Sequence, residues 1–188
     1  SSIVRCPDKG ISLKMENLLK KISKEGDSIG GKITCIIKGV PAGIGEPIYD
    51  KLSARLAYAI LSINACKGFE YGSGFKSASM KGSKNNDIFI SQNGKIITKT
   101  NNNGGILGGI STGMDIWFNA AFKPISSISK NQKTVDYYGN NVNIEIKGRH
   151  DVCPVPRAVP IVEAMTAITI VDMLMQKISQ NINHSLYP

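Results

Sequence analysis

The chain has 188 residues, 41% of them hydrophobic, which is enough for one domain with a sizeable core. Its 23 lysines and arginines against 14 aspartates and glutamates give a formal net charge of +9. No continuous apolar run reaches membrane-spanning length and no secretory signal pattern opens the chain, so we expect no membrane association.

The positive charge comes mainly from lysines spread along the chain, with only four arginines. Aromatic residues make up 6% of the sequence and are not interleaved with the lysines. Segments that bind RNA or DNA usually concentrate their basic residues and often add stacking aromatics. The charge therefore favours a solvated lysine surface or a small anionic ligand over a nucleic-acid partner.

The cysteines show no C-x-x-C spacing, so reduced thiols in a cytosolic protein are the expected state. Only two histidines, His150 and His184, are present, which argues against a zinc site. The four cysteines are Cys6, Cys35, Cys66 and Cys153.

Helical spacing of apolar residues predicts a first helix that stops at Gly26. A strand is expected at residues 32–38, where both faces carry apolar residues, so we expect it to be largely covered. The apolar face of the helix comprises Met15, Leu18, Leu19 and Ile22.

A second helix is expected to open at Glu46-Pro47, with proline in the tolerated first turn, and to run to about Ala65. Apolar residues extend around the cylinder, which predicts a central helix buried on more than one side. Its main stripe comprises Leu52, Leu56, Ala59, Ile60 and Ile63.

Residues 87–98 predict a hairpin that turns at Asn93-Gly94. Residues 101–113 hold too many glycines for the interior of an element. Glycine lets a ligand approach the backbone, although a mobile surface loop has the same composition. A strand at 115–122 leads to the turn 123–127, where a lysine and two serine hydroxyls are able to hold a phosphate.

The stretch 147–165 joins a predicted strand at 142–147 to a final apolar helix at 160–180. Its three prolines stiffen the connection, and the triplet 149–151 carries three ionisable side chains. A stiff loop holds charges at fixed positions, and a solvated loop with incidental charges is an equal alternative. The expected core stripe of the helix comprises Ile161, Ala164, Met165, Ile168 and Met175.

Two buried helices with antiparallel strands before each predict an α+β fold. We expect a β-α-β sandwich with long central helices between antiparallel sheets, in one domain over residues 1–188 with no internal boundary. The residues by themselves indicate an anion-binding loop cluster and name no reaction.

Five segments together resemble the chorismate synthase family, in that family's order and at compatible spacing. They are Gly-Ile-Gly-Glu-Pro-Ile-Tyr-Asp (43–50), Ser-Ile-Asn-Ala-Cys-Lys-Gly (62–68), Gly-Ser-Lys-Asn-Asn-Asp (82–87), Asn-Gly-Gly-Ile-Leu-Gly-Gly-Ile-Ser (103–111) and Gly-Arg-His-Asp (148–151).

The resemblance covers only the C-terminal half of that family, whose members are about twice this length. Both catalytic histidines of the family and several substrate-binding arginines belong to the N-terminal half, and neither His150 nor His184 matches them by position. The resemblance therefore implies a fragment, or one piece of a divided enzyme, that is inactive alone and needs the missing half as a partner.

The family converts 5-enolpyruvylshikimate 3-phosphate to chorismate and phosphate with reduced FMN, in aromatic amino acid biosynthesis. Members are cytoplasmic homotetramers associated with NADP. Carried over residue by residue, Arg149 also binds substrate, and Asp151 matches an aspartate proposed to help remove the ring hydrogen. For Asp151, a cap at the approach to the final helix or an ion pair with Arg157 is the alternative. The implied FMN contacts are Asn64, Ala65, Gly108, Lys123, Pro124, Ile125, Ser126, Ser127 and Arg149.

Two other classes of function stay open. One is a non-catalytic module that binds FMN or another anion, and the other is an assembly fragment that binds nothing but pairs with the missing half. A nucleic-acid binder is the remotest alternative, and steeply salt-dependent binding to generic DNA would revive it.

Overall fold

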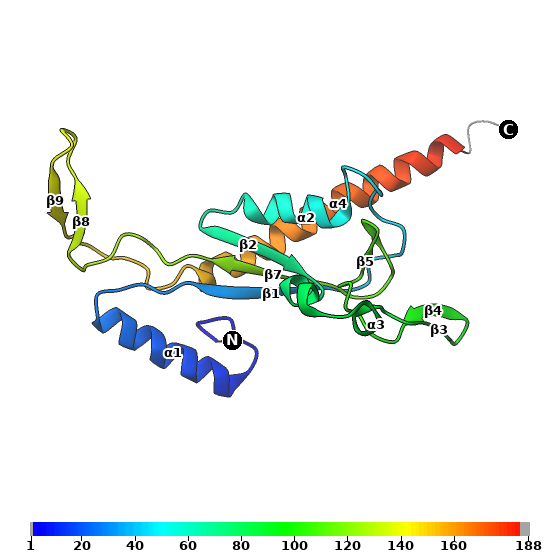
Figure 1. Ribbon diagram of the computed structural model, residues 1–188, viewed down its shortest axis with the longest axis horizontal. Helices are drawn as coiled ribbons and strands as arrows, with labels where there is room; N and C mark the ends of the chain where they lie inside the picture. Colours follow the sequence, from blue (N-terminus) through cyan, green and yellow to red (C-terminus); the bar gives the residue numbers. More distant parts are fainter. Residues whose placement is uncertain (1, 185–188) are drawn as a thin grey trace. The chain divides into compact units, whose positions relative to one another are not determined.

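The computed structural model describes the backbone of residues 2–184 and the side chains of residues 2–180 (Figure 1). The chain divides into two compact units. The first comprises Ser1–Lys32 and Ala121–Val159, and the second comprises Ile33–Ala120 and Pro160–Pro188. The expectation of a domain without an internal boundary stays a prediction for the family fold.

Helix α1 of the first unit spans Lys9–Lys24, which confirms the first predicted helix. The Asp8 carboxylate caps its start by accepting the Ile11 N–H at 2.8 Å. Gly26, with φ of 68°, follows the C-cap Glu25 and ends the helix, as the sequence indicates.

The first unit also contains an antiparallel hairpin formed by β8 (Gln132–Val135) and β9 (Asn141–Ile144). The strand predicted at 142–147 is therefore too long, because pairing ends where Ile144 meets Gln132. Ile144 is 44% exposed, because the hairpin is a separate two-stranded sheet with too few strands to bury its own side chains.

The three-stranded sheet has the order β1-β7-β2, with β1 at Gly31–Ile37, β7 at Ile116–Phe122 and β2 at Cys66–Tyr71. A polar row crosses one face: the Thr34 hydroxyl donates to Asn119 at 2.7 Å, and the Asn119 amide donates to Glu70 at 3.0 Å. Because this row occupies one face, only the other is packed. The prediction that the strand at 32–38 is largely covered is wrong for this chain, because Ile33 is 7% exposed but Ile36 is 59% exposed.

Helix α2 spans Leu52–Leu61 and is shorter than predicted at both ends. Residues 46–50 form a turn instead, in which the Glu46 N–H donates to the Asp50 carbonyl at 3.2 Å and Tyr49 has φ of 59°. The helix is buried on one side only, because Leu56 is fully buried while Tyr58 on the other side is 77% exposed. The prediction that this helix is buried on more than one side is therefore wrong for this chain.

Beyond α2 the chain forms small elements. The predicted hairpin at Asn93-Gly94 is confirmed by β3 (Phe89–Gln92) and β4 (Lys95–Thr98). The glycine-rich stretch is not free of regular structure, since β5 (Ile106–Leu107) and β6 (Ile110–Ser111) pair across Gly108-Gly109, where glycine supplies the two positive φ angles of the turn. The 3₁₀ helix η1 spans Gly74–Ser79 and α3 spans Gly82–Asn85.

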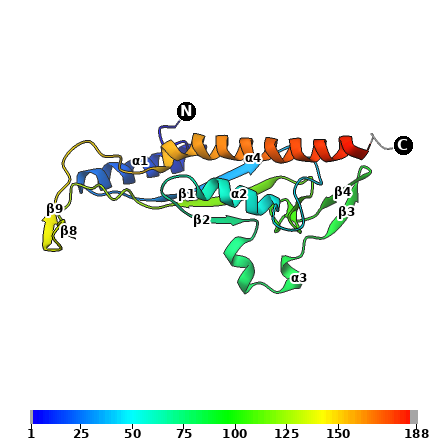
Figure 2. The same cartoon turned by 90° about the horizontal axis from the view of Figure 1, so that it is seen from above.

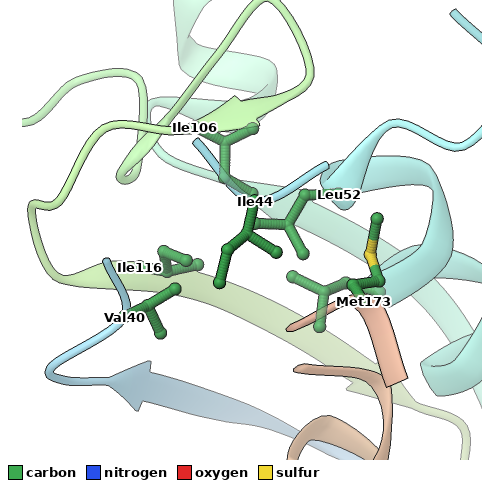
Figure 3. Close-up of a cluster of buried hydrophobic side chains, with 7 residues drawn as sticks. Val40, Ile44, Leu52, Ile106, Ile116 and Met173 are labelled. Carbon is green, nitrogen blue, oxygen red and sulfur yellow. The ribbon is translucent and has the colours of Figure 1, made fainter. Parts of the chain in front are cut away.

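Helix α4 spans Val155–His184 and starts five residues earlier than predicted. Figure 2 shows α2 and the sheet strands of the second unit on one side of α4. The core of this unit forms there, and Figure 3 shows Met173 of α4 directed toward Leu52 and Ile44. The Arg55 guanidinium and the Asp172 carboxylate join α2 to α4 at 3.1 Å.

The core stripe of α4 differs from the predicted one. Ile168 and Met175 of the predicted stripe are 64% and 65% exposed. The helix is apolar almost all round, so periodicity alone does not say which face a given layer covers. The buried residues are Ala158, Val162, Thr166, Thr169 and Met173.

By length and composition alone, Val155–Gln180 of α4 is long and apolar enough to cross a membrane. The sequence criterion of an uninterrupted apolar run missed this, because Glu163 and Asp172 divide the run. Only 28% of its apolar window is buried within the chain. Helices and antiparallel sheets together confirm the α+β class, and the complete sandwich stays a prediction.

Candidate functional site

Three predicted site residues line one polar cavity of about 220 Å³ in the first unit. Ser127 comes from the turn before β8, and Arg149 and Asp151 from the loop before α4. The end of α1 and the segment after it form another part of the wall. The full lining is Ser23, Gly26, Asp27, Ser28, Ser127, Ile128, Ser129, Gly148, Arg149, His150, Asp151 and Val152.

Backbone and side-chain contacts hold the loop that carries Arg149 and Asp151. The Ile29 N–H donates to the Val152 carbonyl at 2.8 Å, which ties the loop to the start of β1. The Asp151 carboxylate lies 2.9 Å from the Arg157 guanidinium in the first turn of α4. The predicted alternative of an Asp151–Arg157 ion pair is therefore present, and it fixes where the carboxylate lies.

The charges around the cavity leave Arg149 as its unpaired cation within the described residues. The Asp27 carboxylate is held by Lys130 at 2.7 Å. The hydrogen bond from Lys130 and that from the Ser28 N–H keep the pKa of Asp27 below its usual value. With Asp27 and Asp151 both neutralised by partners, the cavity suits an anion.

His150, which lines the same cavity, carries a buried ring nitrogen, Nε2, without a hydrogen-bond partner among the described residues. A buried polar atom without a partner is costly, so it indicates a position that a ligand or water satisfies. Sequence reasoning assigned His150 no such role.

The predicted phosphate-holding turn is anchored next to this cavity. The Ser28 hydroxyl donates to the Ile125 carbonyl, and a Cβ at Gly30 would lie 2.2 Å from the Phe122 carbonyl oxygen. Only glycine permits that approach, which brings the start of β1 onto the start of the turn. Lys123, Pro124 and Ser126 are exposed there.

The remaining predicted FMN contacts lie in the second unit. Asn64 is exposed and Ala65 has φ of 69°, both just after α2. Gly108 is exposed at the β5–β6 turn, and no atom lies within 4 Å of a Cβ built there, so packing within the chain does not require glycine. The convergence of these residues with Lys123 and Arg149 stays a prediction.

Two features were missed from the sequence. The segment Gly26-Asp-Ser28 completes the polar cavity, and its turn composition was the only available signal. A second cavity of about 620 Å³, near η1, is lined by none of the predicted residues. Its walls include Phe69, Tyr71 and Phe75, and the buried Oδ1 of Asn85, another lining residue, has no partner among the described residues.

The polar cavity is large enough for a phosphate group, such as the one that FMN carries, but too small for a whole flavin cofactor. Pockets for drug-sized ligands have volumes of roughly 300–1,000 Å³, which exceeds the 220 Å³ found here. Its free guanidinium and its serines are a donor set for an anion. The residues present therefore fit an anionic group of the implied cofactor or substrate.

Comparisons with known proteins agree on one family. The family model described as chorismate synthase matches residues 1–175. The chorismate synthase of Parabacteroides distasonis is 53% identical over 181 residues, covering 96% of this chain and 51% of that protein. The Flavobacterium psychrophilum enzyme is 54% identical over 182 residues, covering 96% and 50%.

A crystal structure of a chorismate synthase matches with a TM-score of 0.76 and 31% identity, covering 92% of this chain and 45% of that one. The chain thus spans about half the length of the curated relatives it matches. The family match extends over nearly the whole chain and agrees with the fold, so the chain belongs to the chorismate synthase family.

Proposed function

We propose that this chain is the C-terminal half of a chorismate synthase, and that it works only with an N-terminal half. The complete enzyme would remove phosphate from 5-enolpyruvylshikimate 3-phosphate to form chorismate, in aromatic amino acid biosynthesis. The observation that carries the proposal is the meeting of Ser127, Arg149 and Asp151 in one cavity, in a chain of this family.

The proposed cofactor-binding residues come from both units. Lys123–Ser127 and Arg149 would bind FMN together with Asn64, Ala65 and Gly108. Reduced FMN, when bound, supplies electron density for the loss of phosphate. The Arg149 fork would hold a carboxylate or phosphate of the substrate as well, since its guanidinium has no acidic partner in the described part of the chain.

Asp151 is the proposed proton acceptor. Its carboxylate lines the cavity beside Arg149, and the ion pair with Arg157 would hold it in one orientation. A general base must be held close to the proton it takes, and the pair supplies that restraint. A carboxylate that lines the cavity while paired is available for this role.

The complete protein is proposed to be a cytoplasmic homotetramer with a β-α-β sandwich, associated with NADP. The bare apolar faces of α2 and α4 support the sandwich, in which further layers cover them. Tyr58, Ile168 and Met175 are exposed here, and soluble proteins rarely leave patches of this kind uncovered. In the sandwich these faces would be covered by the N-terminal half.

FMN titration of variants tests the binding site. Lys123→Ala and Arg149→Ala should each weaken FMN binding by about tenfold, because each removes a cation from an anion site. Lys21→Ala is the matched control, since Lys21 is exposed on α1 and lines no described cavity near the site. Equal weakening by all three variants would reduce the effect to net charge and refute the site.

Reconstitution with an N-terminal half, reduced FMN and substrate tests the chemistry. Asp151→Asn keeps the volume but cannot accept a proton, so turnover should fall strongly while ligand affinity stays nearly unchanged. Arg149→Ala should instead weaken binding. Normal turnover by Asp151→Asn would dismiss the base role and leave Asp151 as an anchor for the loop.

An assembly fragment without ligand binding is the second candidate, favoured by the exposed face of α4. The two candidates differ in a single measurement. A chain that binds no FMN but forms a stable complex with an N-terminal half would be an assembly fragment, and the cofactor site would then belong to the other half.

A further inference from the structure

The first unit contains another cavity, of about 580 Å³, which borders the polar cavity but has a different lining. It is called the lysine-lined cavity below. The two cavities share Ser23, Asp151 and Val152. Arg149 lines only the polar cavity, and no residue of the turn 123–127 lines the larger one. None of the proposed cofactor contacts lines the lysine-lined cavity. Its lining is Ile3, Val4, Leu19, Lys20, Ser23, Lys24, Asp151, Val152, Cys153, Pro156 and Arg157.

The charge in this cavity is positive. Three cations, Lys20, Lys24 and Arg157, face one carboxylate, Asp151, which is already paired with Arg157. Neither lysine takes part in an ion pair among the described side chains. Burial raises the pKa of the Cys153 thiol, so the cysteine adds no negative charge at neutral pH.

The two lysines lie on one face of α1, because positions 20 and 24 are one helical turn apart. Arg157 reaches the cavity from the first turn of α4, so the three cations come from two separate elements of the unit. Lysine and arginine side chains that converge from different elements bind phosphate oxygens with charge-assisted hydrogen bonds. Ile3, Val4 and Leu19 add an apolar part to the wall.

We propose that this cavity is a separate binding site for a phosphate group, held by Lys20, Lys24 and Arg157. The phosphate is either free or carried by a small organic molecule whose body contacts the apolar wall. Because Arg157 also holds Asp151, a bound phosphate competes for the same guanidinium. Occupancy of this site therefore changes how firmly the Asp151 carboxylate is held.

Titration of inorganic phosphate into the chain, followed by the NMR signals of the lysine and arginine side chains, tests the site at constant ionic strength. Lys20→Gln and Lys24→Gln should each weaken saturable binding by about twofold to fivefold, as expected for exposed charge contacts. Lys21→Gln is the matched control, because it removes the same charge from the same helix but does not line the cavity. It should change the affinity less than about twofold.

Absence of saturable binding, or an equal loss in Lys21→Gln, overturns the proposal, since only net charge would then matter. Circular dichroism of each variant verifies folding, and Arg157→Lys, which keeps the charge, should retain part of the affinity. Phenyl phosphate identifies the source of the group. Tighter binding than inorganic phosphate assigns an organic phosphate, and equal binding assigns free phosphate.

Arg149→Gln separates this site from the proposed flavin site. It should weaken FMN binding and leave phosphate binding unchanged. Loss of phosphate binding in Arg149→Gln would place the phosphate in the polar cavity and overturn only the present inference. If Arg149→Gln leaves the FMN affinity unchanged, that result would instead contradict the proposed cofactor site and would not affect the inference of a phosphate site.

Discussion

Replacing Ser111 by alanine should destabilise the second unit by removing one buried hydroxyl that joins two glycine-rich loops. Ser111 lies at the end of β6 and is 3% exposed. Its hydroxyl donates to the Pro41 carbonyl at 2.6 Å and accepts the Ile44 N–H at 2.8 Å. It thus holds the loop before α2 against the β5–β6 hairpin.

The magnitude follows from the groups left without partners. Ile44 is fully buried, so its N–H finds no water after the substitution, and the Pro41 carbonyl also loses its donor. A buried N–H without a partner costs about 1–3 kcal/mol. Pro41 is exposed, so water replaces the donor to its carbonyl, and the total loss should also be about 1–3 kcal/mol. Two backbone bonds, Ser111 N–H to the Ile44 carbonyl and Gly43 N–H to the Ser111 carbonyl, remain and keep the loss from being larger.

Urea unfolding followed by circular dichroism measures the change in the free energy of unfolding. Native-state hydrogen exchange at the Ile44 amide should rise in the same variant, because that amide has lost its acceptor. Ser77→Ala is the control: the exposed Ser77 hydroxyl donates to the Gly74 carbonyl at 2.7 Å, and its loss should change stability by less than about 0.5 kcal/mol. A Ser111→Ala variant as stable as Ser77→Ala would refute the reasoning.

Partial burial raises the pKa of Asp87, but hydrogen bonds from the Thr100 hydroxyl and from two loop N–H groups bring it below its usual value. Since the folded pKa is the lower one, this stabilisation is present above the unfolded pKa of about 3.9 and is lost as the pH falls through the folded pKa. Urea midpoints measured at decreasing pH should show the loss in the native chain, and Asp87→Asn should remove this part of the pH dependence. Gly72→Ala should abolish or severely weaken folding, because the added Cβ would lie 2.1 Å from the Asn102 carbonyl oxygen at φ of 54°. In contrast, Gly139→Ala has a similar positive φ of 86° with no atom within 4 Å, so thermal unfolding should reveal only the conformational cost of about 1–2 kcal/mol, and equal losses at both glycines would contradict the packing argument.

Local chemistry determined several elements from the sequence alone. Helix α1 follows from its apolar spacing and from Gly26, which takes the left-handed conformation after the helix. The β3–β4 hairpin follows from Asn93-Gly94, whose positive φ angles suit a tight turn. These features depend on residues within a few positions of each other, so tertiary contacts are not needed to specify them.

Tertiary structure decided the ends and faces of the apolar helices. Pro47 was compatible with a helix start, yet the bond from the Glu46 N–H to the Asp50 carbonyl closes a turn and delays α2 to Leu52. Helix α4 carries apolar residues all round, and packing against α2 selected the face of Met173 over that of Ile168. Periodicity identifies an apolar surface, but the neighbouring element chooses which part of it is buried.

Some features of the candidate site were likewise predictable from the sequence, and others were decided by the tertiary structure. The sequence pattern singled out Arg149 and Asp151 as rigidly held charges and the turn 123–127 as able to hold a phosphate, and the family resemblance assigned Ser127 to FMN. Only the fold revealed that Asp27 and Lys130 pair beside them and that Arg157 holds the Asp151 carboxylate. Asp27 and Lys130 are 103 positions apart along the chain. A single sequence carries no signal for such a pair, because its energy arises only when folding brings the two charges together.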